Sequence, residues 1–255
     1  MPERIAVPRA LADFFREHPR LALAFSGGVD SAYLLYAAMA CGCDVRAFYA
    51  QSAFQPAFER ADALRLAEQL GAKLTVVPLD VLADDTVRSN PENRCYFCKR
   101  AIFSALIREA KAQGCDAIMD GTNASDDAGD RPGMRALQEL SVLSPLRLCG
   151  LTKADVRRYS REAGLFTWDK PAYACLATRV PAGTPITAEV LTRVEGAETA
   201  LFDLGYADFR VRVFHDAARL QLPGDQFARA AGEREAIREA LKPWFETVLL
   251  DLKAR

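Results

Sequence analysis

Residues 26–31 constrain the fold of this chain more than any other stretch, because they read SGGVDS between two apolar segments. Residues 21–25 predict a buried strand before the loop, and residues 32–39 predict a helix after it. The adjacent glycines allow the backbone to turn sharply and to approach a ligand closely. The free N–H groups at the start of a helix favour an anion such as phosphate. The sequence therefore predicts a phosphate-binding loop.

The spelling of this loop excludes two other phosphate loops. It lacks the Gly-Lys-Ser/Thr ending of a Walker A loop, and it lacks the third glycine of a dinucleotide-binding fingerprint. It resembles the pyrophosphate loop (PP-loop) of the ATP pyrophosphatase superfamily, whose members split ATP between the α and β phosphates. The resemblance implies that ATP contacts Ser26, Gly27, Gly28, Asp30 and Ser31.

Strands and helices are predicted in alternation over the first two thirds of the chain. Short apolar runs predict three further strands, at residues 45–50, 74–79 and 115–120. Apolar spacing and capping signals predict helices at residues 3–17, 58–70, 134–140 and 152–163. This alternation is typical of an α/β fold, a doubly wound parallel sheet. The PP-loop resemblance implies the adenine nucleotide alpha-hydrolase type of that fold.

Ligands of such a sheet bind beyond the carboxyl ends of its strands. We therefore expect Gln51 and Ser52, after the second strand, and Gly121, Thr122 and Asn123, after the fourth, to line the ATP site.

An acidic run follows this second group of residues, at Asp126, Asp127 and Asp130. Mg²⁺ prefers hard oxygen ligands and binds through one or two carboxylates together with phosphates. We expect Asp30 and Asp127 to hold Mg²⁺ against the ATP phosphates, while a solvated acidic loop is the alternative for the run.

The residue pattern of the sequence changes near residue 167. We expect three parts: a PP-loop domain at 1–166, a linker loop at 167–186, and a smaller α+β domain at 187–255. The last part predicts an antiparallel sheet. Helices are predicted at residues 188–203 and 225–241, and strands at residues 208–214, 217–222 and 245–251.

Three of the seven cysteines carry the chemical prediction. Residues 81–94 predict a polar loop that delivers Cys95 and Cys98, a CxxC pair, with a helix after it, and Cys175 lies in the linker. Zinc would need two more ligands of matching spacing, and neither of the two histidines is placed to supply one. Three cysteines without a fourth suit an iron–sulfur cluster with one open iron, while a buried structural thiol is the alternative for Cys175.

Arginines near and after the linker are candidates for binding a phosphate, because the guanidinium fork matches phosphate oxygens. Arg210 and Arg212 alternate on one predicted strand and therefore share a face. With Arg179 they form the predicted phosphate clamp.

The overall composition indicates which kinds of partner and which cellular compartment to expect. Thirty-three Lys and Arg residues nearly balance 34 Asp and Glu residues, so we expect no nucleic-acid partner. No signal peptide or membrane-spanning segment is predicted. The odd number of unevenly spaced cysteines favours a reducing cytoplasm.

Several motifs in order resemble those of the LarE family: SGGVDS, RCYFCK, DGTN and KPAYACLATRVPAGTPIT. The resemblance implies an ATP-dependent sulfurtransferase that adenylates a carboxylate of pyridinium-3,5-biscarboxylic acid mononucleotide, during synthesis of the nickel-pincer nucleotide cofactor of lactate racemase. It implies Cys175 as the reacting cysteine, which some members of the family sacrifice, leaving dehydroalanine, while members with an extra CxxC pair use a cluster. It also implies that Cys95, Cys98 and Cys175 hold a 4Fe-4S cluster, which binds an additional sulfide from a sulfur donor. Family members form homo-oligomers, commonly hexamers.

Three alternatives stay open. The three cysteines also fit a tRNA thiolation enzyme of the same superfamily, and the loop alone fits an ammonia-dependent amidating enzyme. A non-enzymatic nucleotide-binding module would leave the cysteines unexplained.

Overall fold

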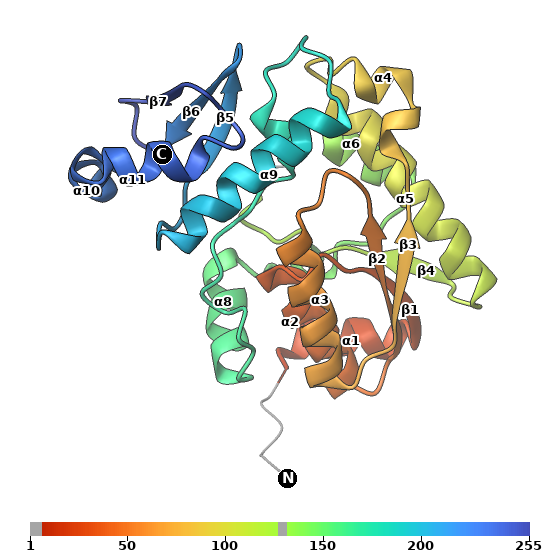
Figure 1. Ribbon diagram of the computed structural model, residues 1–255. Helices are drawn as coiled ribbons and strands as arrows, with labels where there is room; N and C mark the ends of the chain where they lie inside the picture. Colours follow the sequence, from red (N-terminus) through yellow and green to blue (C-terminus); the bar gives the residue numbers. More distant parts are fainter. Residues whose placement is uncertain (1–6, 127–131) are drawn as a thin grey trace. The chain divides into compact units, whose positions relative to one another are not determined.

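The computed structural model describes residues 7–126 and 132–255. The chain forms two compact units (Figure 1). The first comprises the described chain up to Ser52 together with Ala57–Leu79 and Asn93–Lys170, and the second comprises Ala53–Pro56, Asp80–Glu92 and Pro171–Arg255. The second unit therefore takes up two short segments that the sequence places between elements of the first.

The first unit is built on a four-stranded parallel sheet, which confirms the predicted α/β fold. Its strands are β1 (Arg20–Ala24), β2 (Asp44–Gln51), β3 (Leu74–Pro78) and β4 (Ala117–Met119), in the order β3-β2-β1-β4. The chain moves outward from β1 to β3 and then returns to the other side of β1. The point of reversal lies between β1 and β4, which is where ligands of such sheets bind.

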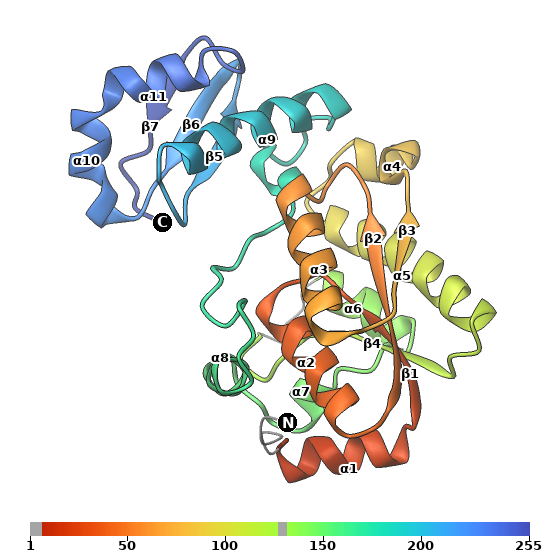
Figure 2. The same cartoon turned by 60° about the horizontal axis from the view of Figure 1, so that its bottom comes forward.

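Helices cover both faces of this sheet (Figure 2). One face packs against five helices: α1 (Arg9–Glu17), α2 (Val29–Ala40), α3 (Ala57–Leu70), α7 (Pro145–Leu148) and α8 (Lys153–Glu162). The other packs against α5 (Arg94–Ala112) and α6 (Pro132–Glu139). Strand β1 shows why two cores form: Leu21 and Leu23 enter the first core, and Ala22 between them enters the second.

Two helix starts in this unit differ from the sequence prediction. Helix α1 begins at Arg9, with Pro8 as its N-cap, and residues 3–6 of the predicted helix lie outside the described residues. Proline disfavours helical backbone at the residue before it, so the helix starts after Pro8. Helix α5 begins at Arg94, so Cys95 and Cys98, its second and fifth residues, lie within the helix and not in a preceding loop.

The second unit begins with two short helical segments, η1 (Val81–Ala83) and α4 (Asp85–Arg88). Its carboxyl-terminal part contains η2 (Leu176–Arg179), α9 (Ala188–Asp203), β5 (Arg210–Phe214), β6 (Ala217–Gln221), η3 (Gly224–Gln226), α10 (Phe227–Gly232), α11 (Arg234–Leu241) and β7 (Val248–Leu250). The side chain of Asn90 ties the two parts together, because its amide donates to the carbonyl oxygens of Pro181 at 2.8 Å and Thr184 at 3.1 Å.

The three-stranded sheet of this unit corrects two predictions. Strands β5 and β6 are antiparallel, but β6 and β7 are parallel, so the sheet is mixed. The helices between β6 and β7 form a crossover that returns the chain in the same direction. The helix predicted over 225–241 is divided into η3, α10 and α11. The division between α10 and α11 follows Gly232, a weak helix former.

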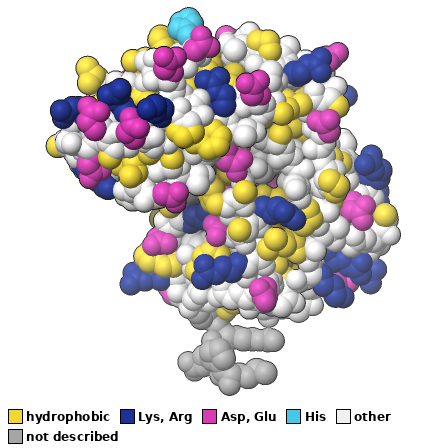
Figure 3. Space-filling view, viewed as in Figure 1, with side chains coloured by type: hydrophobic (Ala, Val, Ile, Leu, Met, Phe, Trp, Pro, Cys, Tyr) yellow, Lys and Arg dark blue, Asp and Glu magenta, His cyan; other side chains and the backbone are white. Residues whose placement is uncertain are grey.

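The surface agrees with the balanced composition. Positive and negative side chains are interspersed over the face seen in Figure 3. Within the described residues, no helix combines the length and the apolar character needed to cross a membrane.

Candidate functional site

The SGGVDS loop connects β1 to α2 at the carboxyl end of the sheet. Gly28 is the N-cap of α2, and the backbone N–H of Phe25 donates to the carbonyl oxygen of Phe48 on β2 at 2.9 Å. The two serine hydroxyl oxygens lie 3.1 Å apart, and the hydroxyl of Ser31 lies 3.2 Å from the carbonyl oxygen of Gly28. These contacts fix a short loop in front of a helix start that is free to bind an anion.

Two glycines allow the backbone to pack tightly here. Gly27 has φ +71°, and a Cβ on it would lie 3.0 Å from the Cα of Ala63 on α3. A Cβ on Gly121, after β4, would lie 2.9 Å from the backbone nitrogen of Ser31. Larger residues at either position would push the chain away from the loop. The predicted residues after β1 and β4 therefore lie side by side at the point where the strand order reverses.

Asp30 is the charged centre of this arrangement. Its carboxylate accepts a hydrogen bond from the Lys153 ammonium at 2.5 Å and another from the Asn123 amide at 3.3 Å. Burial raises the pKa of Asp30 above its ordinary value, while the Lys153 contact opposes that shift and the nearby Asp126 carboxylate adds to it. A carboxylate that is costly to ionise and lies beside a second one is suited to a cation ligand.

The segment after β4 is held by its own hydrogen bonds. Asp120 is buried and accepts from the Thr122 hydroxyl at 2.5 Å and from the Ser144 hydroxyl at 2.7 Å. The carboxylate of Asp126 accepts from the backbone N–H of Asn123 at 2.9 Å. Asp127, the predicted second magnesium ligand, lies outside the described residues, as does Asp130. Asp126 is therefore the described member of the acidic run that reaches Asp30.

Gln51 and Ser52 follow the same edge of the sheet. Gln51 is the last residue of β2, and its carbonyl oxygen accepts from the backbone N–H of Leu79 at 2.8 Å. Both residues are half-buried. They lie one strand away from the loop, at the carboxyl end where the prediction put the ATP site.

The two CxxC thiols differ in exposure. Cys95 is exposed and Cys98 is buried. Cys95 lines a cavity of about 380 Å³, together with Thr122 and Asp126 from the segment after β4. The first cysteine of the pair therefore opens toward the same segment that reaches Asp30. Within residues 7–126 and 132–255, no group of three His, Cys, Asp or Glu side chains is arranged to hold a metal ion.

Cys175 lies in the second unit, directly before η2. Its thiol is partly exposed. Its carbonyl oxygen accepts from the backbone N–H of Thr178 at 3.0 Å and from the Thr178 hydroxyl at 2.9 Å. The next residue, Leu176, donates its N–H to the carbonyl oxygen of Phe54 at 2.9 Å. The backbone of the predicted reacting residue is therefore fixed on both sides.

Arg179 differs from the prediction of a phosphate ligand. Its side chain is fully buried and forms a two-point ion pair with Glu198, at 2.8 and 3.1 Å. Its third nitrogen donates to the carbonyl oxygen of Ala174 at 2.7 Å, and the guanidinium stacks on the Tyr173 ring at 4.4 Å. Tyr173 also donates its hydroxyl to Glu198. Arg179 therefore holds the cysteine segment, and its donors are already occupied.

Arg210 and Arg212 alternate with buried valines on β5, so they share the face opposite the core. Arg212 donates to the carbonyl oxygen of Thr178 at 2.8 Å, whereas the buried Nε of Arg210 has no hydrogen-bond partner among the described residues. Burial and neighbouring arginines, Arg255 and Arg179 among them, lower the pKa of both guanidinium groups. A cluster of positive charge of this kind favours an anionic ligand.

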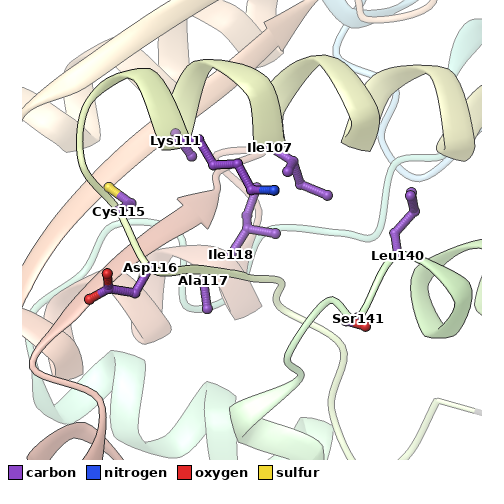
Figure 4. Close-up of a pocket in the computed structure, with 9 residues that line it drawn as sticks. Ile107, Lys111, Cys115, Asp116, Ala117, Ile118, Leu140 and Ser141 are labelled. Carbon is purple, nitrogen blue, oxygen red and sulfur yellow. The ribbon is translucent and has the colours of Figure 1, made fainter.

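A second cavity, of about 260 Å³, lies at the amino end of β4 (Figure 4). Cys115 and Asp116 line it before the strand, and Lys111 lines it from α5. Gly121 and the other predicted residues follow the opposite end of the same strand. This cavity is therefore separate from the candidate site.

Sequence reasoning missed Lys153 and Glu198. Lys153 is the first residue of α8, where the helix dipole disfavours a positive charge. A lysine at the first position of a helix therefore indicates a nearby carboxylate. Glu198 shares the buried stripe of α9 with Leu191, Val194 and Leu201. A carboxylate within an apolar stripe indicates a buried partner, although the sequence does not say which.

The family described as thiamine biosynthesis protein (ThiI) matches residues 18–201. An uncharacterised protein of Synechocystis sp. is 38% identical over 247 residues, which cover 95% of this chain and 92% of that protein.

Two relatives of described function also match. The pyridinium-3,5-bisthiocarboxylic acid mononucleotide synthase of Lactiplantibacillus plantarum is 37% identical over 206 residues, 80% of this chain and 75% of that enzyme. The tRNA-specific 2-thiouridylase MnmA of Thermotoga sp. is 26% identical over 188 residues, which cover 57% of this chain and 52% of that enzyme. The similarity to the mononucleotide synthase is both higher and more extensive.

Proposed function

Because the chain belongs to the ThiI family and to the LarE family of mononucleotide synthases, we propose that it uses ATP to replace a carboxylate oxygen of pyridinium-3,5-biscarboxylic acid mononucleotide by sulfur. The observation that carries the proposal is the meeting of three features in one unit. The SGGVDS loop, the Asp30–Lys153 pair and the exposed Cys95 thiol all adjoin the segment after β4. The phosphate loop would bind the ATP that activates the substrate carboxylate. The nearby Cys95 thiol belongs to the cysteines that would deliver the sulfur.

The first chemical step is adenylation. A carboxylate oxygen of the substrate attacks the α-phosphorus of ATP, the bond between the α-phosphorus and its bridging oxygen breaks, and pyrophosphate leaves. The loop N–H groups and the start of α2 bind the departing phosphates. Lys153, beside Asp30, stabilises the negative charge that develops there.

We assign the metal that accompanies ATP to Asp30 and a second carboxylate from the acidic run. Asp30 and a residue of the acidic run, Asp126 or the predicted Asp127, would supply the hard oxygen atoms that Mg²⁺ prefers. Bound there, Mg²⁺ would neutralise phosphate charge. Gln51, Ser52 and Thr122 would complete the nucleotide site along the same edge.

The second step is transfer of sulfur. A sulfur nucleophile adds to the activated acyl carbon and expels AMP, which carries away the original carboxylate oxygen, and one proton is released as the thiocarboxylate forms. Cys175, held by Thr178 and Arg179, is the residue we assign to this step. If its own sulfur is used, the Cys175 thiolate first forms a thioester with the acyl carbon; loss of the Cα proton and cleavage of the Cβ–S bond then release the thiocarboxylate and leave the residue as dehydroalanine.

We propose instead that sulfur is recycled through a 4Fe-4S cluster. Cys95 and Cys98 lie three residues apart on one helical turn, and adjacent thiols of this kind suit an iron–sulfur cluster. With Cys175 they would supply three thiolates to such a cluster, and one iron would stay open for an additional sulfide. The source of that sulfide is a separate donor.

The remaining predictions concern recognition and assembly. Arg210 and Arg212 are proposed to bind the substrate phosphate, since the buried Nε of Arg210 has no hydrogen-bond partner in the described part of the chain and lies beside other positive charges. We propose that residues 187–255 carry this site and the contacts of a cytoplasmic homo-oligomer, a hexamer as in the LarE family.

The test is a reaction of anaerobically purified protein with ATP, Mg²⁺, sulfide and the biscarboxylate. We expect AMP release that depends on the substrate, and a product in which sulfur replaces oxygen by mass spectrometry. About four irons per chain and an unchanged Cys175 mass would support recycling. Loss of H₂S from Cys175 would indicate sacrifice, and AMP release that needs tRNA instead would favour the thiouridylase alternative.

A further inference from the structure

The cavity beside Cys95 contains one described lysine. Its walls come from α5, from the segment after β4 and from the start of α6, all in the first unit, and include Cys95, Lys99, Thr122, Asp126 and Met134. Lys99 lies four residues after Cys95, so the two side chains share one face of α5. A thiol and an ammonium group are therefore presented to the same space.

The stem of Lys99 is fitted to Gly133 of α6. A Cβ on that glycine would lie 3.1 Å from the Cδ of Lys99 and 3.3 Å from its Cε. These distances are shorter than ordinary side-chain contacts, so Gly133 provides room for the lysine to cross α6. Among the described residues, no carboxylate forms an ion pair with Lys99, although Asp126 lines the same cavity. The ammonium group is thus available to an anion.

The proposed substrate carries two carboxylates on one ring, and only one of them reacts at a time. The other keeps its charge throughout adenylation, and a charged group is held best by a charged hydrogen-bond donor. Lys99 would attract that carboxylate, whereas Asp126, a candidate Mg²⁺ ligand, belongs with the ATP phosphates at the reacting end. The cavity can therefore distinguish one end of a dicarboxylate from the other.

We infer that Lys99 binds the non-reacting carboxylate and makes the enzyme prefer a ring dicarboxylate to a monocarboxylate. The inference rests on the proposed function and adds a residue that selects the substrate. It also extends to the second round, in which the group opposite Lys99 is the thiocarboxylate formed in the first. That group carries the same negative charge, so one residue serves both rounds.

The test compares two probes that differ by one carboxylate, pyridinium-3,5-biscarboxylic acid mononucleotide and nicotinic acid mononucleotide. Lys99→Met removes the charge and keeps much of the stem. We expect kcat/KM for AMP release with the biscarboxylate to fall roughly tenfold to hundredfold, mainly through KM. The monocarboxylate value should change less than about twofold, because the lost contact is absent from that probe. Lys99→Arg should restore part of the preference.

Lys111→Met is the matched control, since Lys111 lies on the same helix and lines the other cavity. It should leave both probes unaffected. An equal loss on both probes in Lys99→Met, or no loss, would overturn the inference. If the monocarboxylate reacts too slowly, its inhibition constant gives the same comparison. Failure of the wild-type protein to release AMP with the biscarboxylate would contradict the proposed function itself, whatever Lys99 does.

Discussion

The Asp30–Lys153 pair of the first unit and the Arg179–Glu198 pair of the second differ in exposure. The Asp30 and Lys153 side chains of the first unit are 21% and 33% exposed. The Arg179 and Glu198 side chains of the second are 0% and 2% exposed, and Glu198 also accepts from the Val211 N–H at 2.9 Å. An accessible pair can exchange partners with a nucleotide and a metal. A sealed pair with every oxygen in use can only hold its surroundings in place.

Glu198→Gln tests the sealed pair and should have the largest effect. It keeps the shape of the side chain and leaves the Arg179 charge buried without a counter-charge. Breaking a buried pair from one side costs about 3–5 kcal/mol. We expect a loss of that size in the free energy of unfolding, measured by urea unfolding of the full chain.

Glu239→Gln provides the comparison for that experiment. Glu239 pairs with Lys242 at 3.5 Å, but both side chains are about two-thirds exposed. Surface pairs contribute about 0–1 kcal/mol, so this variant should unfold almost as the wild type does. Equal losses in the two glutamate variants would show that the sealed pair does not hold the second unit together.

Sequence reasoning succeeded where the structure depends on neighbours in the chain. The strand, glycine turn and helix around SGGVDS are local, and so is the capping signal of the helix predicted at 152–163, where the structure has a capping box of Thr152 and Asp155. The parallel sheet followed from the alternation of elements. The reversal of the strand order then brought the segments after β1 and β4 together.

It failed where partners are distant. Arg179 looked like a phosphate ligand because nothing local reveals that Glu198, nineteen residues on, occupies its fork. Asp30 and Lys153 are 123 residues apart, and only the packed fold makes them a pair. The mixed sheet of the second unit was missed because a strand's direction depends on the crossover before it.

Lys153→Met tests the accessible pair. If Lys153 stabilises the negative charge that develops on the phosphates, removing its ammonium group should lower the rate of AMP release by roughly tenfold to hundredfold. That is the usual contribution of one charged hydrogen bond. Arg158→Met on the same helix removes a surface charge paired with Asp155 and should leave the rate unchanged. Full activity of Lys153→Met would make this pair structural, like the sealed one.

Gly27→Ala measures how far the loop depends on close packing. A non-glycine residue at φ +71° costs about 1–2 kcal/mol, and contact with Ala63 adds to that cost. Gly42→Ala is the matched control, because Gly42 has φ +77° and open space around its Cβ position. Both variants should lose stability in thermal unfolding, Gly27→Ala more, and only Gly27→Ala should lose ATP binding. Equal losses and intact ATP binding would contradict the close approach.

Asp30→Asn should have the smallest effect on stability and still abolish AMP release. Burial raises the pKa of Asp30 in the folded protein, so the folded state binds this proton more tightly than the unfolded chain does. The stability gained from that proton is complete below about pH 4 and is lost as the pH rises through the raised pKa. The variant should therefore match the wild type in urea unfolding at low pH and be slightly more stable at about pH 7. A variant that is less stable at neutral pH would mean that the Lys153 contact outweighs burial. Asp30 would then contribute to the fold as Glu198 does, and the contrast between the two pairs would fail.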